Sequence, residues 1–69
     1  MWKDGIIDGY RYQVKVFDEG SEFGINGGRI SKLWMQKDGK EAANYDRGWD
    51  VRPTGKAKAA YEKLLAMYN

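Results

Sequence analysis

The sequence predicts an α+β domain, in which an antiparallel β-meander of four or five strands is packed by one C-terminal α-helix. Three observations carry this prediction. Turn dipeptides divide residues 1–52 into short segments, apolar and polar residues alternate within several of these segments, and the apolar period lengthens after Pro53. Consecutive strands joined by tight turns are antiparallel neighbours, and an amphipathic helix can cover one face of such a sheet. We expect residues 1–69 to form a single domain.

Glycine-containing turns mark the strand ends. Asp8-Gly9, Asn26-Gly27 and Asp38-Gly39 each suit the type I′ hairpin turn, because Asp, Asn and Gly tolerate the positive φ that this turn requires. Asp18-Glu19-Gly20 indicates a fourth turn with a longer loop. The strands expected between these turns cover residues 2–7, 10–17, 21–25, 28–36 and 40–51.

The strand at residues 10–17 has the clearest alternation. Its two faces carry Tyr10, Tyr12, Val14 and Val16 against Arg11, Gln13 and Lys15. In the strand at 28–36, Ile30 is out of phase with Leu33, which predicts a β-bulge near Ser31.

The first and last strands are less regular. Residues 2–7 have the weakest pattern, because Asp4 lies between two apolar residues of the same face. Within residues 40–51, alternation places Arg47 on the same face as Trp49. We therefore expect the guanidinium of Arg47 to stack on that indole as a cation–π contact.

A helix is expected over residues 55–68. Pro53 ends the last strand, and Thr54 is suited to the helix N-cap. One narrow apolar stripe follows the helical period and comprises Ala57, Ala60, Tyr61, Leu64 and Tyr68. Asn69 is placed to cap the other end.

Composition excludes several classes of function. The chain has no cysteine and no histidine, which removes disulfides, thiolate catalysis, Cys/His zinc sites and an imidazole base. The formal net charge of +2 is small for a DNA-binding protein. No apolar run approaches the ~18 residues that span a membrane, and the first residues lack the pattern of a signal peptide. We expect a cytoplasmic protein without cofactors.

No residue pattern predicts an enzyme. The four glycines at positions 20, 24, 27 and 28 match neither a P-loop nor a dinucleotide fingerprint, so we assign them to turns and a bulge. Asp46 and Asp50 would be roughly 13 Å apart on an extended strand, which is too far for a shared metal or a glycosidase pair. We expect no catalytic and no metal-binding residues.

One weak anion site is predicted where the last strand turns into the helix. Arg52, Lys56 and Lys58 cluster beside the positive end of the helix dipole. The alternative is that these side chains are simply solvated.

The aromatic residues point to a binding surface. Three Trp, five Tyr and two Phe are many for a chain of this length. Alternation and the helical period assign one group to the layer between sheet and helix: Tyr10, Tyr12, Phe23, Tyr61, Leu64 and Tyr68. Trp34 and Phe17 fall on the opposite face. One helix is about 10–12 Å wide and five strands span nearly 20 Å, so part of the sheet should stay uncovered.

The predicted partner-binding residues lie on this uncovered face and in the glycine-rich loop: Trp34, Phe17, Arg11, Lys15, Arg29 and Asn26. Exposed apolar patches mark interaction sites. The alternative, which the sequence leaves open, is that Trp34 only packs against the stems of neighbouring basic residues.

The stretches Asp18–Leu33 and Tyr45–Asp50 resemble a small uncharacterised domain family of phages and integrated mobile elements in Firmicutes. The resemblance extends from about Gly9 to Asn69. It implies a mobile-element setting and assigns no activity to any residue. Small accessory proteins of such elements often bind host machinery, and anti-CRISPR-like inhibitors are among them.

Three hypotheses about function therefore remain. The first is a non-enzymatic protein-binding accessory protein of a phage or mobile element, acting in the host cell against a defence system. The alternative is a nucleic-acid-binding module that stacks bases on the aromatic and basic sheet face. An enzyme is the third and least supported hypothesis. An open sheet on a small core also predicts a homodimer.

Overall fold

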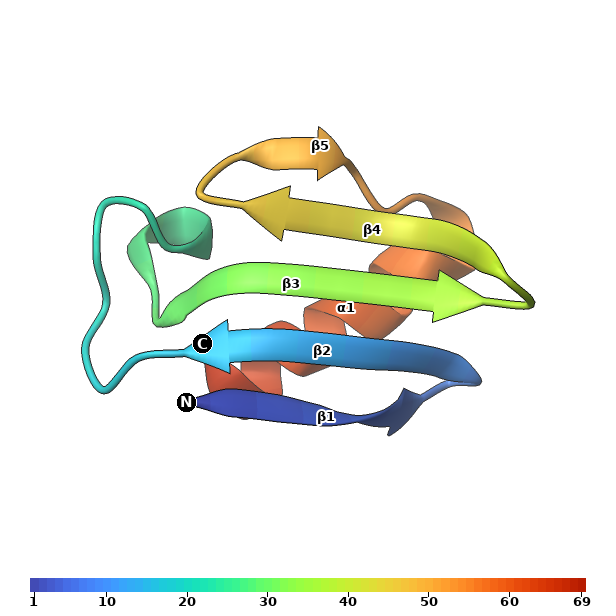
Figure 1. Ribbon diagram of the computed structural model, residues 1–69, viewed down its shortest axis with the longest axis horizontal. Helices are drawn as coiled ribbons and strands as arrows, with labels where there is room; N and C mark the ends of the chain where they lie inside the picture. The colour runs from blue at the N-terminus through green and yellow to red at the C-terminus, as the bar shows by residue number, and fades with distance from the viewer.

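The computed structural model describes all 69 residues and confirms the α+β architecture (Figure 1). Five strands form one antiparallel sheet in the order β1-β2-β3-β4-β5, and one helix lies behind it. The elements are β1 (Trp2–Ile7), β2 (Tyr10–Val16), the 3₁₀ turn η1 (Ile25–Gly27), β3 (Ile30–Lys37), β4 (Lys40–Asp46), β5 (Trp49–Val51) and α1 (Gly55–Tyr68). The helix α1 is too short and too polar to cross a bilayer.

Two of the predicted hairpin turns are confirmed. Asp8-Gly9 joins β1 to β2, and Asp38-Gly39 joins β3 to β4. All four residues have positive φ, between 51° and 84°. Because each two-residue turn fixes the register of its hairpin, Ile7 pairs with Tyr10 and every following pair of β1 and β2 is determined.

The predicted strand at residues 21–25 is wrong. The chain instead forms tight turns that end in η1, with hydrogen bonds from Gly24 N to Ser21 O and from Gly27 N to Gly24 O, both 3.0 Å long. Glycines allow this compact path, since a Cβ on Gly24 would lie 2.0 Å from the carbonyl oxygen of Gly28. Asn26-Gly27 has positive φ as expected, but it lies in this loop and joins no hairpin.

The predicted strand at residues 40–51 is two strands. The chain reverses at Arg47-Gly48, where Arg47 adopts a φ of +58°. β4 and β5 then pair, with Tyr45 opposite Trp49. Arginine gives no sequence signal for a left-handed backbone position, so alternation alone did not reveal this turn.

The β-bulge predicted near Ser31 is confirmed. Lys15 pairs with Lys32 and Val16 pairs with Ile30, which leaves Ser31 as the extra residue of β3. The bulge lets Ile30 and Leu33 both point into the core despite their odd spacing, with exposures of 0 % and 1 %.

The helix packs its predicted stripe against the sheet. Ala57, Ala60, Tyr61 and Leu64 are buried and Tyr68 is half-buried. Thr54 occupies the N-cap without a side-chain cap hydrogen bond. At the other end, the Asn69 amide binds the glycine-rich loop, because its Oδ1 accepts from Ile30 N and its Nδ2 donates to Ile25 O, both at 3.0 Å. A Cβ on Gly28 would lie 2.3 Å from this amide.

Candidate interaction surface

The helix leaves one face of the sheet uncovered, and Figure 1 looks onto it. Residues directly opposite each other in an antiparallel pair point to the same face, so the register defines this surface. We call it the open face. The cross-strand pairs that form it are Trp2 with Lys15, Asp4 with Gln13, Ile6 with Arg11, Arg11 with Gln36, Gln13 with Trp34, Lys15 with Lys32, Trp34 with Asn44, and Lys32 with Asp46.

Large apolar side chains on the open face are accessible to solvent. Trp2 is 56 % exposed and Ile6 is 72 % exposed. Phe17, just beyond β2, is 45 % exposed, and Trp34 is half-buried. By contrast, Tyr12, Val14, Leu33 and Met35, which β2 and β3 turn toward the helix, are buried. The exposed Trp2 and Ile6 therefore leave apolar surface uncovered on the open face.

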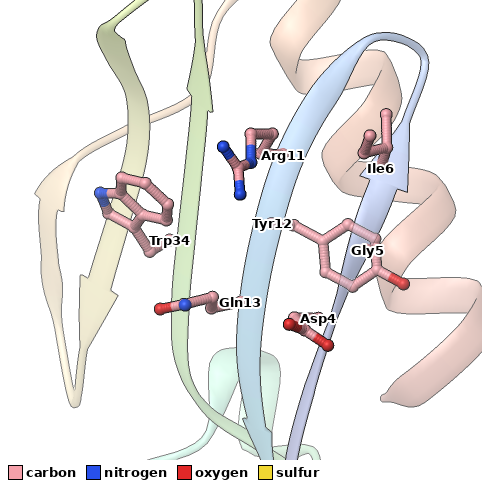
Figure 2. Close-up of a pocket in the computed structure, with 7 residues that line it drawn as sticks. All are labelled: Asp4, Gly5, Ile6, Arg11, Tyr12, Gln13 and Trp34. Carbon is pink, nitrogen blue, oxygen red and sulfur yellow. The ribbon is translucent and has the colours of Figure 1, made fainter.

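A shallow hollow of ≈ 300 Å³ lies beside Trp34 (Figure 2). Arg11 and Gln13 point from β2 toward Trp34, and Asp4 and Ile6 border the hollow on β1. The indole is held in place from β4, since Trp34 Nε1 donates a 3.1 Å hydrogen bond to Glu41 Oε2. A ring fixed in this way loses little freedom when a partner covers it.

The Tyr12 ring crosses β1 at Gly5 and connects the edge strand to the helix (Figure 2). A Cβ on Gly5 would lie 2.8 Å from the Tyr12 hydroxyl, so only glycine leaves room for the ring. The Tyr12 hydroxyl lies 2.8 Å from that of Tyr68. This hydrogen bond, reinforced by burial, raises the pKa of Tyr12 to about 12.

A second hollow, of ≈ 250 Å³, lies where the long loop leaves β2. Its lining combines two phenyl rings and three cationic side chains: Phe17, Phe23, Lys15, Lys32 and Arg47. We call these five residues the cationic end. Lys15 Nζ lies 5.4 Å from the Phe17 ring centre, and Asp46 Oδ1 lies 3.9 Å from both Lys32 Nζ and Arg47 Nε.

The prediction that Phe23 lies between sheet and helix is wrong. Its side chain is 53 % exposed, and Ile25 is buried in the core instead, at 1 % exposure. The cause is the loop conformation, because strand alternation does not apply to a chain of turns. The Phe23 backbone is nevertheless anchored, since the Tyr45 hydroxyl donates a 2.7 Å hydrogen bond to its carbonyl oxygen.

The two loop residues predicted to bind a partner lie apart from Trp34. Arg29 is half-buried, and its Nε donates a 3.2 Å hydrogen bond to Tyr68 O at the C-terminal end of the helix. Asn26 is exposed and borders a third hollow, of ≈ 280 Å³, beside Trp49 and Tyr61.

Arg52 and Lys58 line this third hollow, whereas Lys56 does not. The Arg52 guanidinium lies 5.6 Å from the Trp49 ring centre. It occupies the cation–π position that was predicted for Arg47, because the turn at Arg47-Gly48 directs Arg47 to the cationic end. Nowhere in the chain do three or more acidic side chains gather into a group that could hold a metal ion.

Trp2 and Ile6 lie on the open face but were not among the predicted binding residues, although the sequence holds one signal for them. The Asp8-Gly9 turn fixes pairs whose residue numbers sum to 17, which places Trp2 opposite Lys15 and Ile6 opposite Arg11. No comparable signal reveals that Phe23 and Arg47 line the same hollow, because their positions depend on the irregular loop and on an arginine turn.

The chain belongs to the family described as Domain of unknown function (DUF7678), whose model matches residues 1–69. No curated protein and no solved structure matches the chain. The family description assigns no activity, and it carries no functional residue over to this chain. Function is therefore inferred from the side chains that the fold brings together.

Proposed function

We propose that this member of a family of unknown function is a small non-enzymatic protein-binding module, which engages its partner through the open face. The observation that carries the proposal is the exposure of Trp2 and Ile6 next to Trp34, on a sheet that one helix covers on the other side only. Exposed apolar patches of this kind mark interaction sites, and Trp is enriched among the residues that dominate binding energy.

The polar residues of the open face fit the same role. Basic and acidic side chains alternate around the two indoles, with Arg11, Lys32, Asp4 and Asp46 among them. Protein interfaces commonly surround an aromatic centre with such a charged rim, which sets orientation and partner choice.

The protein is further proposed to belong to a phage or mobile element and to act in its host cell. The resemblance to a family of phages and integrated mobile elements supports an accessory protein that acts in the host cytoplasm. A binding module without histidine or cysteine would then act by covering a host protein, as an anti-CRISPR-like inhibitor of a defence enzyme does.

Affinity capture from a lysate of the native host tests the proposal. We expect wild type to enrich a defined protein, and the double variant Trp2→Ala/Trp34→Ala to enrich it about tenfold less, because two anchors of the open face are lost. Met67→Ala is the matched control, since Met67 is 54 % exposed but lies on the helix. Equal capture by all three proteins, each folded by circular dichroism, would refute the open face as the binding surface.

A nucleic-acid-binding module is the second candidate. It is favoured by the interleaving of Trp34 with Arg11 and Lys32, which could stack and neutralise a single strand. Asp4, Glu41 and Asp46 on or beside the same face oppose it. Fluorescence anisotropy with oligo-dT at low salt is decisive, since phosphate-driven binding must appear there and weaken steeply as salt rises.

A further inference from the structure

We infer that the cationic end binds an acidic segment of the partner protein, and that this segment inserts an aromatic or large apolar side chain between Phe17 and Phe23. The inference rests on the proposed function and names the partner chemistry at one end of the open face. Figure 1 shows that the long loop leaves β2 at the same end of the sheet as the β4–β5 turn, and the residues of the cationic end come from these segments and the adjoining strands.

The positively charged side chains of the cationic end repel one another in the free protein. Lys15 and Lys32 are directly opposite each other on neighbouring strands, and like charges in that position are destabilising. Arg47 adds a third positive charge to the same hollow. An anionic partner would relieve this repulsion, whereas the folded monomer leaves most of it in place.

One carboxylate is too little to neutralise three cations. Asp46 is the only acidic residue that forms an ion pair with any of them, and both of its contacts are long, at 3.9 Å. Asp18, Glu19 and Glu22 belong to the adjacent loop, but none of them forms an ion pair. The lining of the hollow therefore carries three positive side chains and no carboxylate.

The backbone at Arg47 is a second, independent observation. Its φ of +58° is unfavourable for a residue with a side chain, and glycine or asparagine would relieve the strain. Backbone strain of this kind persists where the side chain has a task. Here the strained turn places a guanidinium on the wall of the hollow, and this group can donate paired hydrogen bonds to a carboxylate.

Apolar surface lies beside these charges. Phe17 and Phe23 come from the same connecting loop, are 45 % and 53 % exposed, and line the same hollow. Ser21 and Ser31 border it as well. Two open phenyl faces next to guanidinium and ammonium groups are complementary to a ring that follows or precedes a carboxylate in a peptide.

Charge favours an acidic peptide over a nucleic acid at this site. A phosphate backbone would continue from the cationic end along the open face, where it would meet the carboxylates of Asp46 and Asp4. A peptide with a few carboxylates would engage only the local surplus of positive charge. The structure thus points to an acidic and aromatic protein segment.

NMR titration of the ¹⁵N-labelled protein with a short synthetic peptide of glutamate and phenylalanine tests the inference. We expect chemical-shift changes at Phe17, Ser21, Phe23 and Lys32, with an affinity that falls as salt rises. The same peptide with glutamine in place of glutamate should not bind. Lys32→Gln/Arg47→Gln should weaken binding about tenfold, whereas Lys40→Gln/Lys56→Gln, an equal charge change on exposed residues that do not line the hollow, should retain it.

A stability measurement separates a binding role from a structural one. Lys15→Gln removes one member of the repelling pair together with its cation–π contact to Phe17, so the two effects offset and the Tm of the free protein should change little while its peptide affinity falls. A large fall in Tm for this variant would show that Lys15 is structural and would overturn the inference.

The remaining outcomes are distinguishable. Absence of any peptide-induced shift, or shifts confined to Trp34, Arg11 and Gln13, would overturn the inference and leave the proposed function intact. Tighter binding of oligo-dT than of the peptide at the same residues would overturn both, and would identify the cationic end as a nucleic-acid site.

Discussion

The two faces of the sheet are built from the same strands but differ in burial and chemistry. Leu33 and Trp34 are chain neighbours, and the first is 1 % exposed under the helix whereas the second is half-buried on the open face. The covered face contributes Val14, Leu33 and Met35 to the apolar core, and the helix contributes Ala60 and Leu64. The open face holds indoles, charges and shallow hollows. Substitutions that test stability and substitutions that test the proposed binding can therefore be placed at neighbouring residues of a single strand.

The sharpest test of this comparison replaces the two neighbours in turn. Leu33→Ala should destabilise the protein by about 2–5 kcal/mol, because it leaves a cavity under the helix. Trp34→Ala should cost about 1 kcal/mol and keep the cooperative transition. Urea unfolding followed by circular dichroism measures both, and equal losses would contradict a division of labour between the faces.

A smaller loss of stability is expected at Asn69, which fixes the C-terminal end of the helix to the glycine-rich loop. Asn69→Ala removes the acceptor of Ile30 N and the donor to Ile25 O, and should cost about 1–3 kcal/mol. Gly28→Ala should cost a similar amount, since its methyl group would displace the same amide. Because both substitutions disturb the same Asn69 amide, the double variant should lose less unfolding free energy in urea than the sum of the losses of the two single variants. Additive losses would contradict this shared contact.

Alkaline pH should lower the free energy of unfolding through Tyr12 on the covered face, while the open face is unaffected. The folded-state pKa of Tyr12 is raised to about 12, mainly by its hydrogen bond to Tyr68, above the usual value of 10.0. The protonated form is thus favoured by folding, so its contribution is fully present below pH 10 and is lost as pH rises toward 12. Tyr12→Phe should cost about 1 kcal/mol at neutral pH and flatten this decline in thermal melts recorded from pH 9 to 12. An unchanged alkaline slope would contradict the assignment.

The smallest effect on stability is expected at the sheet edge. β1 pairs with β2 without any register shift, and it carries Trp2 and Ile6 exposed on an edge that no strand covers. Such an edge favours pairing with a second copy. Ile6→Lys should change stability by less than about 0.5 kcal/mol and reduce self-association. Sedimentation at micromolar concentration measures this, and a monomeric wild type would refute the homodimer.

Regular parts of the fold were predictable from local chemistry. Asp8-Gly9 and Asp38-Gly39 provide the positive φ of hairpin turns, and the stripe from Ala57 to Tyr68 follows the helical period. The out-of-phase Ile30 revealed the bulge at Ser31. These signals act within a few residues, so they remain visible without the rest of the structure.

The parts that were not predictable depend on packing between distant residues. The glycines around Gly24 follow a path set by close backbone contact with Gly28, and not by strand alternation. The turn at Arg47 uses a residue that rarely adopts positive φ. The candidate site divides in the same way. The face on which Trp34, Arg11 and Lys15 lie follows from alternation, whereas Phe23 comes to the same hollow as Lys15 only through the folded loop.

The nearest-neighbour order of the strands has a consequence for how the chain folds. Each strand pairs only with the strands that precede and follow it, so most sheet pairings have low contact order, and such topologies fold quickly for a β-rich protein. The helix follows all five strands in the chain. We therefore expect hairpins to form first, with Val14, Leu33 and Met35 still in water, and helix docking to be the step that commits the molecule to its native state.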